Sequence, residues 1–279
     1  MRPTKPIEIE LGVPFITKKC ASGILRTIVE ILMYQRNQIP FVYGTLRTII
    51  TKLELLDENS ELDDAATARV PKMHATKQRT QAKEAFYNAE ILFDTIDKIL
   101  MEHSTVREVM ILFGRTIYTA KEAIVINLPP INARLPGYNH QREMNKNLHQ
   151  IAKTLSLSDE HTDNMLVQDT TNMFVLIKPL VIPQQIGKSN SIYPLDEFQL
   201  PSKCVRFVIN MKTSEAKTEG SVGMCEKFLI FEEGHETPSV IDNRPESTIE
   251  TEDMTCWHQL GVVVKGFKPA FRKGCQLWE

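Results

Sequence analysis

Residues 31–43 read ILMYQRNQIPFVY and contain the end of an apolar helix followed by a polar, aromatic exit. Upstream of them, apolar residues recur every three or four positions, which is the period of a helix with one buried side. We expect a helix over about 21–38 that ends before Pro40, because the residue preceding a proline is disfavoured in helical geometry. Three side chains near its end are polar or aromatic: Tyr34, Gln35 and Arg36. A helix end of this composition is suited to contact another protein.

The same period predicts three more helices. A short one covers about 46–55, and a long one covers 80–102. Another begins near Asn139, a residue favoured at the N-cap. Its apolar stripe consists of Met144, Leu148, Ile151 and Leu155, and its opposite side is moderately polar, with Asn145, Asn147, His149 and Gln150. The stripe either packs against the protein's own sheet or receives a partner helix in a groove.

Apolar runs predict strands in two groups. The first group is a hairpin that leaves through 109–113, ends at Gly114 and returns through 124–128. The second group lies in the C-terminal half, at 174–180, 205–211, 227–231 and 262–265. Helices interleaved with a hairpin and followed by strands predict an α+β fold in one domain.

We place that domain at 20–279, after an N-terminal extension over 1–19. Within the domain, 57–81 is acidic and then basic with few large apolar residues, and 232–253 is polar and acidic. We expect both segments to be mobile surface loops.

The composition is typical of a soluble globular protein, and a net charge of −2 gives no general attraction to nucleic acid or to anionic membranes. The five cysteines are widely spaced and none belongs to a C-x-x-C pair. We therefore expect reduced thiols in an intracellular protein. We find no signal peptide and no apolar run long enough to span a membrane.

No catalytic, cofactor-binding or metal-binding motif is evident. Gly187-Lys188-Ser189 resembles the end of a phosphate-binding loop, but Ile182 occupies the position where that loop requires glycine. The seven histidines are scattered along the chain. We expect a protein without enzymatic activity or cofactor. A divergent enzyme is the alternative, and a pocket with converging ionisable groups and shifted pKa values would indicate it.

Four stretches, in order along the chain, resemble the comet family of HORMA-domain adaptors. They are Met33–Pro40 with Tyr43; Val109–Gly114 followed by Ala120-Lys121-Glu122; Tyr193-Pro194 with Phe198–Ser202; and Trp257-His258-Gln259 with Val264–Phe267. The helix exit and the Lys-Gly-Phe of the last stretch are the most distinctive. Together the stretches extend over most of residues 20–270.

The resemblance implies a HORMA-like fold, with three helices packed on a mainly antiparallel sheet and a C-terminal region of the safety-belt type. It implies an adaptor that binds the closed conformer of the spindle-checkpoint protein Mad-two by imitating its dimer partner. The adaptor would present Mad-two to an AAA+ ATPase that remodels HORMA proteins. The mitotic checkpoint complex would then be disassembled and the spindle assembly checkpoint silenced. Such a protein would occupy the nucleus and cytoplasm, and associate with the spindle or kinetochores in mitosis.

The resemblance also assigns residues to the Mad-two surface. Gln35 matches an interface glutamine of the family, and Leu148 stands where the family has an interface phenylalanine. Met144 and Ile151, on the same stripe, complete the expected contact. Leucine keeps an apolar anchor but has less area than an aromatic ring. We expect Leu148→Glu to abolish binding without disturbing the fold.

Two further assignments concern the ATPase and the C-terminal tail. Pro194 matches the proline of the family's ATPase-contacting Pro-Lys-Leu, whereas Leu195 and Asp196 depart from that motif. Trp257 and Phe267 match a tail that folds back onto the domain, and we expect truncation before them to lower the melting temperature. The alternative is a HORMA protein that entraps a partner's peptide under its belt, as a checkpoint or chromosome-axis scaffold. It requires a belt site not filled by residues around Phe267.

Overall fold

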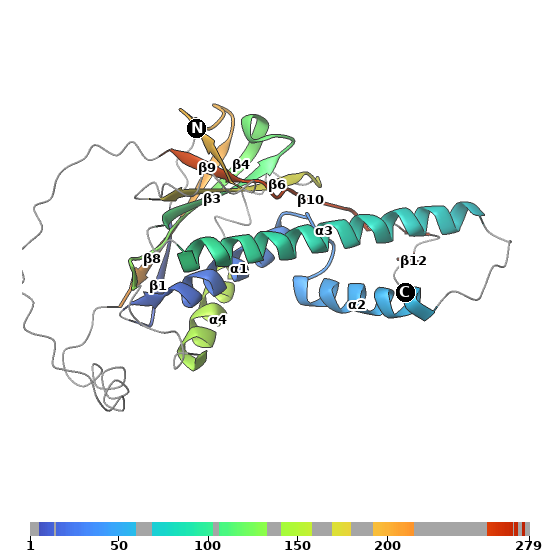
Figure 1. The fold of residues 1–279 in the computed structure, drawn as a ribbon, viewed down its shortest axis with the longest axis horizontal. Coiled ribbons are helices and arrows are strands. Elements are labelled where there is room, and N and C mark those ends of the chain that lie inside the picture. Colours follow the sequence, from blue (N-terminus) through green and yellow to red (C-terminus); the bar gives the residue numbers. More distant parts are fainter. Residues whose placement is uncertain are drawn as a thin grey trace, which may run out of the picture.

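The computed structural model describes residues 6–13, 15–59, 69–102, 106–132, 141–157, 169–179, 192–214, 256–269, 271–272 and 275–276. These residues form an α+β fold in which helices lie along one face of a mixed sheet (Figure 1). The predicted fold class is therefore confirmed at the level of α+β.

Four α-helices are present in the described part of the chain. They are α1 (Lys18–Gln35), α2 (Tyr43–Asn59), α3 (Arg69–Glu102) and α4 (Gln141–Leu157), and a short 3-10 helix η1 covers Ile117–Thr119. Helix α1 packs against both α3 and α4, and α2 packs along α3 where α3 extends beyond the sheet (Figure 1). The extension of α3 and its partner α2 form the elongated end of the molecule.

The main sheet has eight strands in the order β1-β8-β4-β3-β6-β9-β7, with β10 also paired to β6. They are β1 (Ile7–Leu11), β3 (Val106–Gly114), β4 (Ala120–Asn127), β6 (Asn172–Pro179), β7 (Ile192–Leu195), β8 (Val205–Thr213), β9 (Trp257–Leu260) and β10 (Val264–Lys265). Strand β8 runs parallel to both of its neighbours, and the other pairings are antiparallel. The sheet is therefore mixed, and most of its described pairings are antiparallel, as the resemblance implied.

Two pairs of short strands complete the structure: β2 (Ile16–Thr17) with β5 (Ile131–Asn132), and β11 (Phe271–Arg272) with β12 (Cys275–Gln276). Together β1 and β2 place residues 7–17 inside the fold. The beginning of the sheet thus lies in the segment that the sequence assigned to an N-terminal extension.

Both faces of the central strands are covered, which explains their continuous apolar sequence. Val109, Ile111 and Phe113 of β3 join the core beneath the helices. The alternate residues Met110 and Leu112 join a smaller core on the opposite face. Side chains packed against that smaller core come from β7, β9 and the segments beside them: Leu195, Phe198, Leu200, Trp257 and Val263.

The acidic and basic connection predicted at 57–81 is helical at both of its ends. Helix α2 continues to Asn59 and α3 begins at Arg69, so 69–81 was wrongly assigned to a loop. Six of these residues are Lys, Gln or Arg, which favour helix, and Pro71 lies in the first turn, where a helix tolerates proline. Residues 60–68, the predicted loop 232–253 and the predicted strand 227–231 lie outside the described residues.

Candidate partner-binding face

The exit of α1 is built by a specific C-cap. Asn37 adopts a left-handed conformation (φ 53°). The N–H of Asn37 donates to the carbonyl of Tyr34 at 3.0 Å, and the N–H of Gln38 donates to that of Met33 at 2.8 Å. These two bonds form a Schellman motif, in which asparagine can replace glycine at the left-handed position. The helix therefore ends before Pro40 is reached.

Arg36, predicted to face solvent, is fully buried. Its Nε donates to Oε1 of Glu122 on β4 at 2.6 Å, and neither side chain has exposed surface. The guanidinium also lies 5.8 Å from the ring centre of Phe207. Burial raises the pKa of Glu122, and the nearby Arg36 charge acts in the opposite direction. The pair fixes the helix exit to the centre of the sheet, so Arg36 belongs to the core.

Gln38 connects the helix exit to the C-terminal tail. Its side chain is buried, and its Oε1 accepts a hydrogen bond from the N–H of Thr171 at 2.8 Å. Its backbone carbonyl accepts from the N–H of Phe267 at 2.9 Å. The neighbouring Gly266 lies so close that an added Cβ would approach Gln38 Oε1 to 2.5 Å. Glycine at 266 allows the tail to pass over the end of α1.

The two residues assigned to the tail lie on the domain. Trp257 begins β9 opposite Leu195 and packs against the smaller core. Phe267 is buried in the core beneath the helices. Pro194, assigned to the ATPase, lies in β7 opposite His258 and is exposed, as is its neighbour Tyr193.

The apolar stripe of α4 points into the protein. Ile151 and Leu155 are fully buried, and Met144 and Leu148 are partly buried against the same core. Ile151 thus has no surface to offer a partner. Of the two interpretations of the stripe, the structure has the helix packed on its own domain. A charge at Leu148 should disturb that packing, so Leu148→Glu is not a neutral probe of binding.

Gln35 lies at the junction of α1 and α4. Its Nε2 donates to the backbone carbonyl of Leu155 at 3.1 Å, and its buried Oε1 has no hydrogen-bond partner among the described residues. The bond brings the last turn of α1 beside the last turn of α4. Gln35 therefore holds the two helix ends together, and its oxygen remains an acceptor without a donor.

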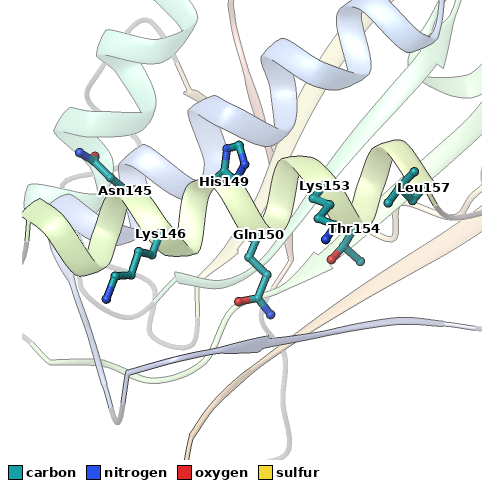
Figure 2. A pocket seen from close by; sticks show the side chains of 7 residues that line it. All are labelled: Asn145, Lys146, His149, Gln150, Lys153, Thr154 and Leu157. Atoms are coloured by element: carbon teal, nitrogen blue, oxygen red, sulfur yellow. The ribbon is translucent and has the colours of Figure 1, made fainter.

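The accessible surface near this junction comes from residues that the apolar stripe did not indicate. Tyr34 is 46% exposed, and Leu157 at the end of α4 is 66% exposed. The outer side of α4 borders an open hollow of about 1100 Å³, lined by Asn145, Lys146, His149, Gln150, Lys153, Thr154 and Leu157 (Figure 2). Leu157 is thus exposed among polar side chains, an arrangement that suits a protein interface with an apolar anchor and a polar rim. We call Tyr34, His149, Lys153 and Leu157 the outer patch.

Asn147, expected on the polar outer side of α4, is buried. Its Oδ1 accepts a hydrogen bond from the N–H of Gly12 at 3.1 Å. Asn147 thereby holds α4 to the end of β1. Nothing in the helical period distinguishes it from its exposed neighbours, because its partner is 135 residues away in the sequence.

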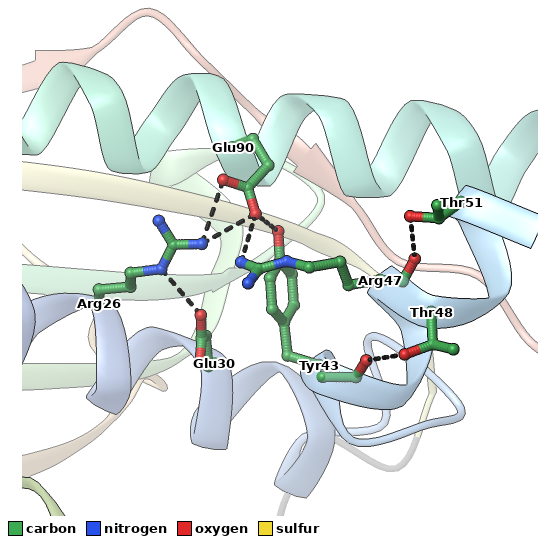
Figure 3. Close-up of polar contacts among 8 residues, drawn as sticks. Arg26, Glu30, Tyr43, Arg47, Thr48, Thr51 and Glu90 are labelled. Carbon is green, nitrogen blue, oxygen red and sulfur yellow. Dashed lines mark hydrogen bonds and ion pairs between the residues drawn. The ribbon is translucent and has the colours of Figure 1, made fainter. Parts of the chain in front are cut away.

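A cluster of charged and polar side chains joins α1, α2 and α3, and its role is structural. Glu90 of α3 accepts hydrogen bonds from Arg26, Tyr43 and Arg47 at 2.8–2.9 Å, and Arg26 also binds Glu30 (Figure 3). Burial alone would raise the pKa of Glu90, but the hydrogen bonds from Arg47 and Tyr43 and the two arginine charges outweigh it, so this pKa is lowered. Burial, reinforced by Glu90, raises the pKa of Tyr43. Tyr43 is thus a packing residue.

Within the described residues, no three His, Cys, Asp or Glu side chains form a group that could hold a metal ion. Cys20 and Cys204 are buried free thiols, and burial raises the pKa of each to about 11, which disfavours the reactive thiolate. No described helix is long and apolar enough to cross a membrane.

Comparison with known proteins gives no assignment: no protein-family model matches the chain, and no curated protein is significantly similar to it.

Proposed function

We propose that this protein is a non-enzymatic adaptor of the HORMA type that binds the closed conformer of Mad-two through the outer patch. The observation that carries the proposal is that Leu157 and Tyr34 are both exposed at adjoining helix ends and that Leu157 lines an open hollow. This surface comprises the end of the first helix and the outer side of α4. Those are the two elements that the sequence resemblance assigns to the partner.

The burial of the stripe changes which residues we propose for the contact. Ile151 is excluded because it is buried, and Met144 and Leu148 mainly support α4 from beneath. Leu157 is the best apolar anchor on the outer side, since burying a leucine side chain stabilises a complex by about 1.5–3 kcal/mol. Gln35 is the polar candidate, because its buried Oε1 lacks a donor that a rearranged interface could supply. His149 and Lys153 would form the polar rim.

Presentation of Mad-two to the AAA+ ATPase, disassembly of the mitotic checkpoint complex and checkpoint silencing belong to the same proposal. Their support is Pro194, which lies on the exposed edge strand β7, with Tyr193 exposed beside it. The proposed sites of action are the nucleus, the cytoplasm and, in mitosis, the spindle.

The peptide-entrapping scaffold is the alternative function. It receives less support, because the chain's own Phe267 occupies the core at the end of α1 and β10 pairs with β6. In a protein that entraps a peptide under its belt, the partner's peptide, and not the chain's own residues, would occupy these places.

Purified components test the proposal. The chain is mixed with Mad-two locked in the closed form by a bound peptide, and complex formation is followed by size-exclusion chromatography. Leu157→Glu should weaken binding at least tenfold, since loss of about 1.4 kcal/mol corresponds to a factor of ten. Ile91→Glu is the matched control, because Ile91 is 51% exposed on a different helix. Equal binding by both variants contradicts the assignment of the patch.

A further inference from the structure

Strand β1 lies at an edge of the main sheet, and its outer edge carries backbone groups that can pair with another strand. In the order of the described strands, β1 is terminal and has β8 as its one strand neighbour. The carbonyl of Leu11 accepts a hydrogen bond from Ser214, just beyond β8, at 3.1 Å. Because backbone direction alternates along a strand, Glu8, Glu10 and Gly12 direct their N–H and C=O groups away from β8.

Side chains of α4 already take the place of a strand at one end of this edge. Gln150 Nε2 donates to the carbonyl of Glu10 at 3.1 Å, and Asn147 Oδ1 accepts from the N–H of Gly12. Gln150 is exposed, so its hydrogen bond to the Glu10 carbonyl can be replaced by one from an incoming backbone N–H. Asn147 is buried, and its Nδ2 has no hydrogen-bond partner in the described part of the molecule. Two outward backbone groups of this edge are thus already hydrogen-bonded, and the Nδ2 of Asn147 beside them is a donor without a described acceptor.

The side of α4 that lines the hollow reaches this edge at Gln150, which bonds to Glu10. Figure 2 shows Lys146 and Gln150 projecting from α4 on the side of the pale blue strand, while His149 projects from the opposite side. Lys146 and Lys153 are the charged residues among those that line the hollow. On the other face of the sheet, Glu8 is paired with Lys212, and Glu10 is exposed. A strand added here would have positive charge beside the side chains that face α4.

We propose that an extended, acidic segment of a partner protein adds to the outer edge of β1, beside α4. Backbone hydrogen bonds to Glu8 and Glu10 supply the affinity, as in other cases of strand addition to a sheet edge. Alternate side chains then face α4, and carboxylates at those positions meet Lys153. The other side chains face the side of Glu10, where neutral residues are favoured. This site goes beyond Mad-two binding because it uses β1, and it shares only Lys153 with the outer patch.

The probe is a fluorescein-labelled seven-residue peptide in which glutamate alternates with threonine, titrated with the full chain and followed by fluorescence anisotropy. Saturable binding is expected. Binding should be lost when the peptide backbone is N-methylated at alternate positions, since methylation removes the N–H donors without changing the side chains. It should also be lost when lysine replaces glutamate. Equal binding of the methylated and unmethylated peptides overturns the proposal, as does failure of the unmodified peptide to bind.

Two variants locate the site. Glu10→Pro removes an outward N–H and should abolish binding. An edge strand tolerates proline at such a position, because the missing N–H is not needed for pairing within the sheet. Glu10→Ala keeps the N–H and should bind as the wild type does, so equal affinity for Glu10→Pro and Glu10→Ala contradicts the proposal. Lys153→Glu should weaken binding at least threefold. Lys98→Glu, an exposed position on α3 with the same change of charge, should leave it unchanged.

The peptide titration on the wild-type chain remains decisive if Glu10→Pro fails to fold. It contains no Mad-two, so its result is independent of the proposed adaptor function.

Discussion

Removing one member of the buried Arg36–Glu122 pair should destabilise the protein strongly. Both side chains have no exposed surface, and Arg36 Nε lies 2.6 Å from Glu122 Oε1. In Glu122→Leu the guanidinium stays buried without its counter-charge, which costs about 3–5 kcal/mol in comparable pairs. Glu122 Oε2 has no hydrogen-bond partner among the described residues, so the carboxylate of the native pair is incompletely satisfied. We therefore expect a cost near the lower limit, about 3 kcal/mol.

The double variant Arg36→Met with Glu122→Leu removes both charges and should recover most of that loss. A buried pair replaced by apolar residues of similar volume is often neutral or stabilising, and methionine also packs well against the ring of Phe207. Chemical denaturation followed by circular dichroism gives the free energies of unfolding of the wild type, the two single variants Arg36→Met and Glu122→Leu, and the double variant. A loss below about 1 kcal/mol for Glu122→Leu, or a double variant as unstable as the sum of the single variants, refutes the reasoning.

Three other predictions concern stability. Glu90→Gln should lower the free energy of unfolding by about 1 kcal/mol at pH 7, because the glutamate accepts charged hydrogen bonds. The lowered pKa of Glu90 confers stability that is fully present above the unfolded value of 4.5 and is lost as pH falls through the folded value. The difference between the two proteins should thus shrink in denaturation curves recorded at pH values progressively below 4.5, and a constant difference would exclude this linkage. Gly266→Ala should cost about 1–3 kcal/mol, because its Cβ would meet Gln38 at 2.5 Å, and an unchanged melting temperature would show that the tail adjusts freely. Leu148→Glu should lower the melting temperature whereas Leu157→Glu should not, and thermal melts of the two variants with the same shift would contradict the assigned burial.

Helical period predicted which sides of α1, α3 and α4 are buried, because burial against one sheet imposes that period directly on the sequence. The hairpin of β3 and β4 was also predicted, since its strands are local and covered on both faces. The period could not show that the stripe of α4 faces its own domain. Inward and partner-facing stripes have the same pattern.

Features that depend on distant pairing were missed. Ile7–Leu11 alternates between apolar and acidic residues, a signal for a strand, but its partner β8 lies about 200 residues later. Arg36 looked like a surface residue because its counter-charge, Glu122, is 86 residues away. The helix stop at Asn37 was attributed to Pro40, although asparagine before a turn indicates a left-handed cap. The residues that α4 contributes to the outer patch lie on the side of the helix opposite its apolar stripe, from which the partner contact was predicted.

The central claim is that the outer patch binds closed Mad-two. Isothermal titration calorimetry tests it most directly, with the purified chain titrated separately with closed and open Mad-two. The account predicts saturable one-to-one binding to the closed conformer, weakened at least tenfold by Leu157→Glu and unchanged by Ile91→Glu. No binding to the closed conformer, or equal binding to the closed and open conformers, would contradict it.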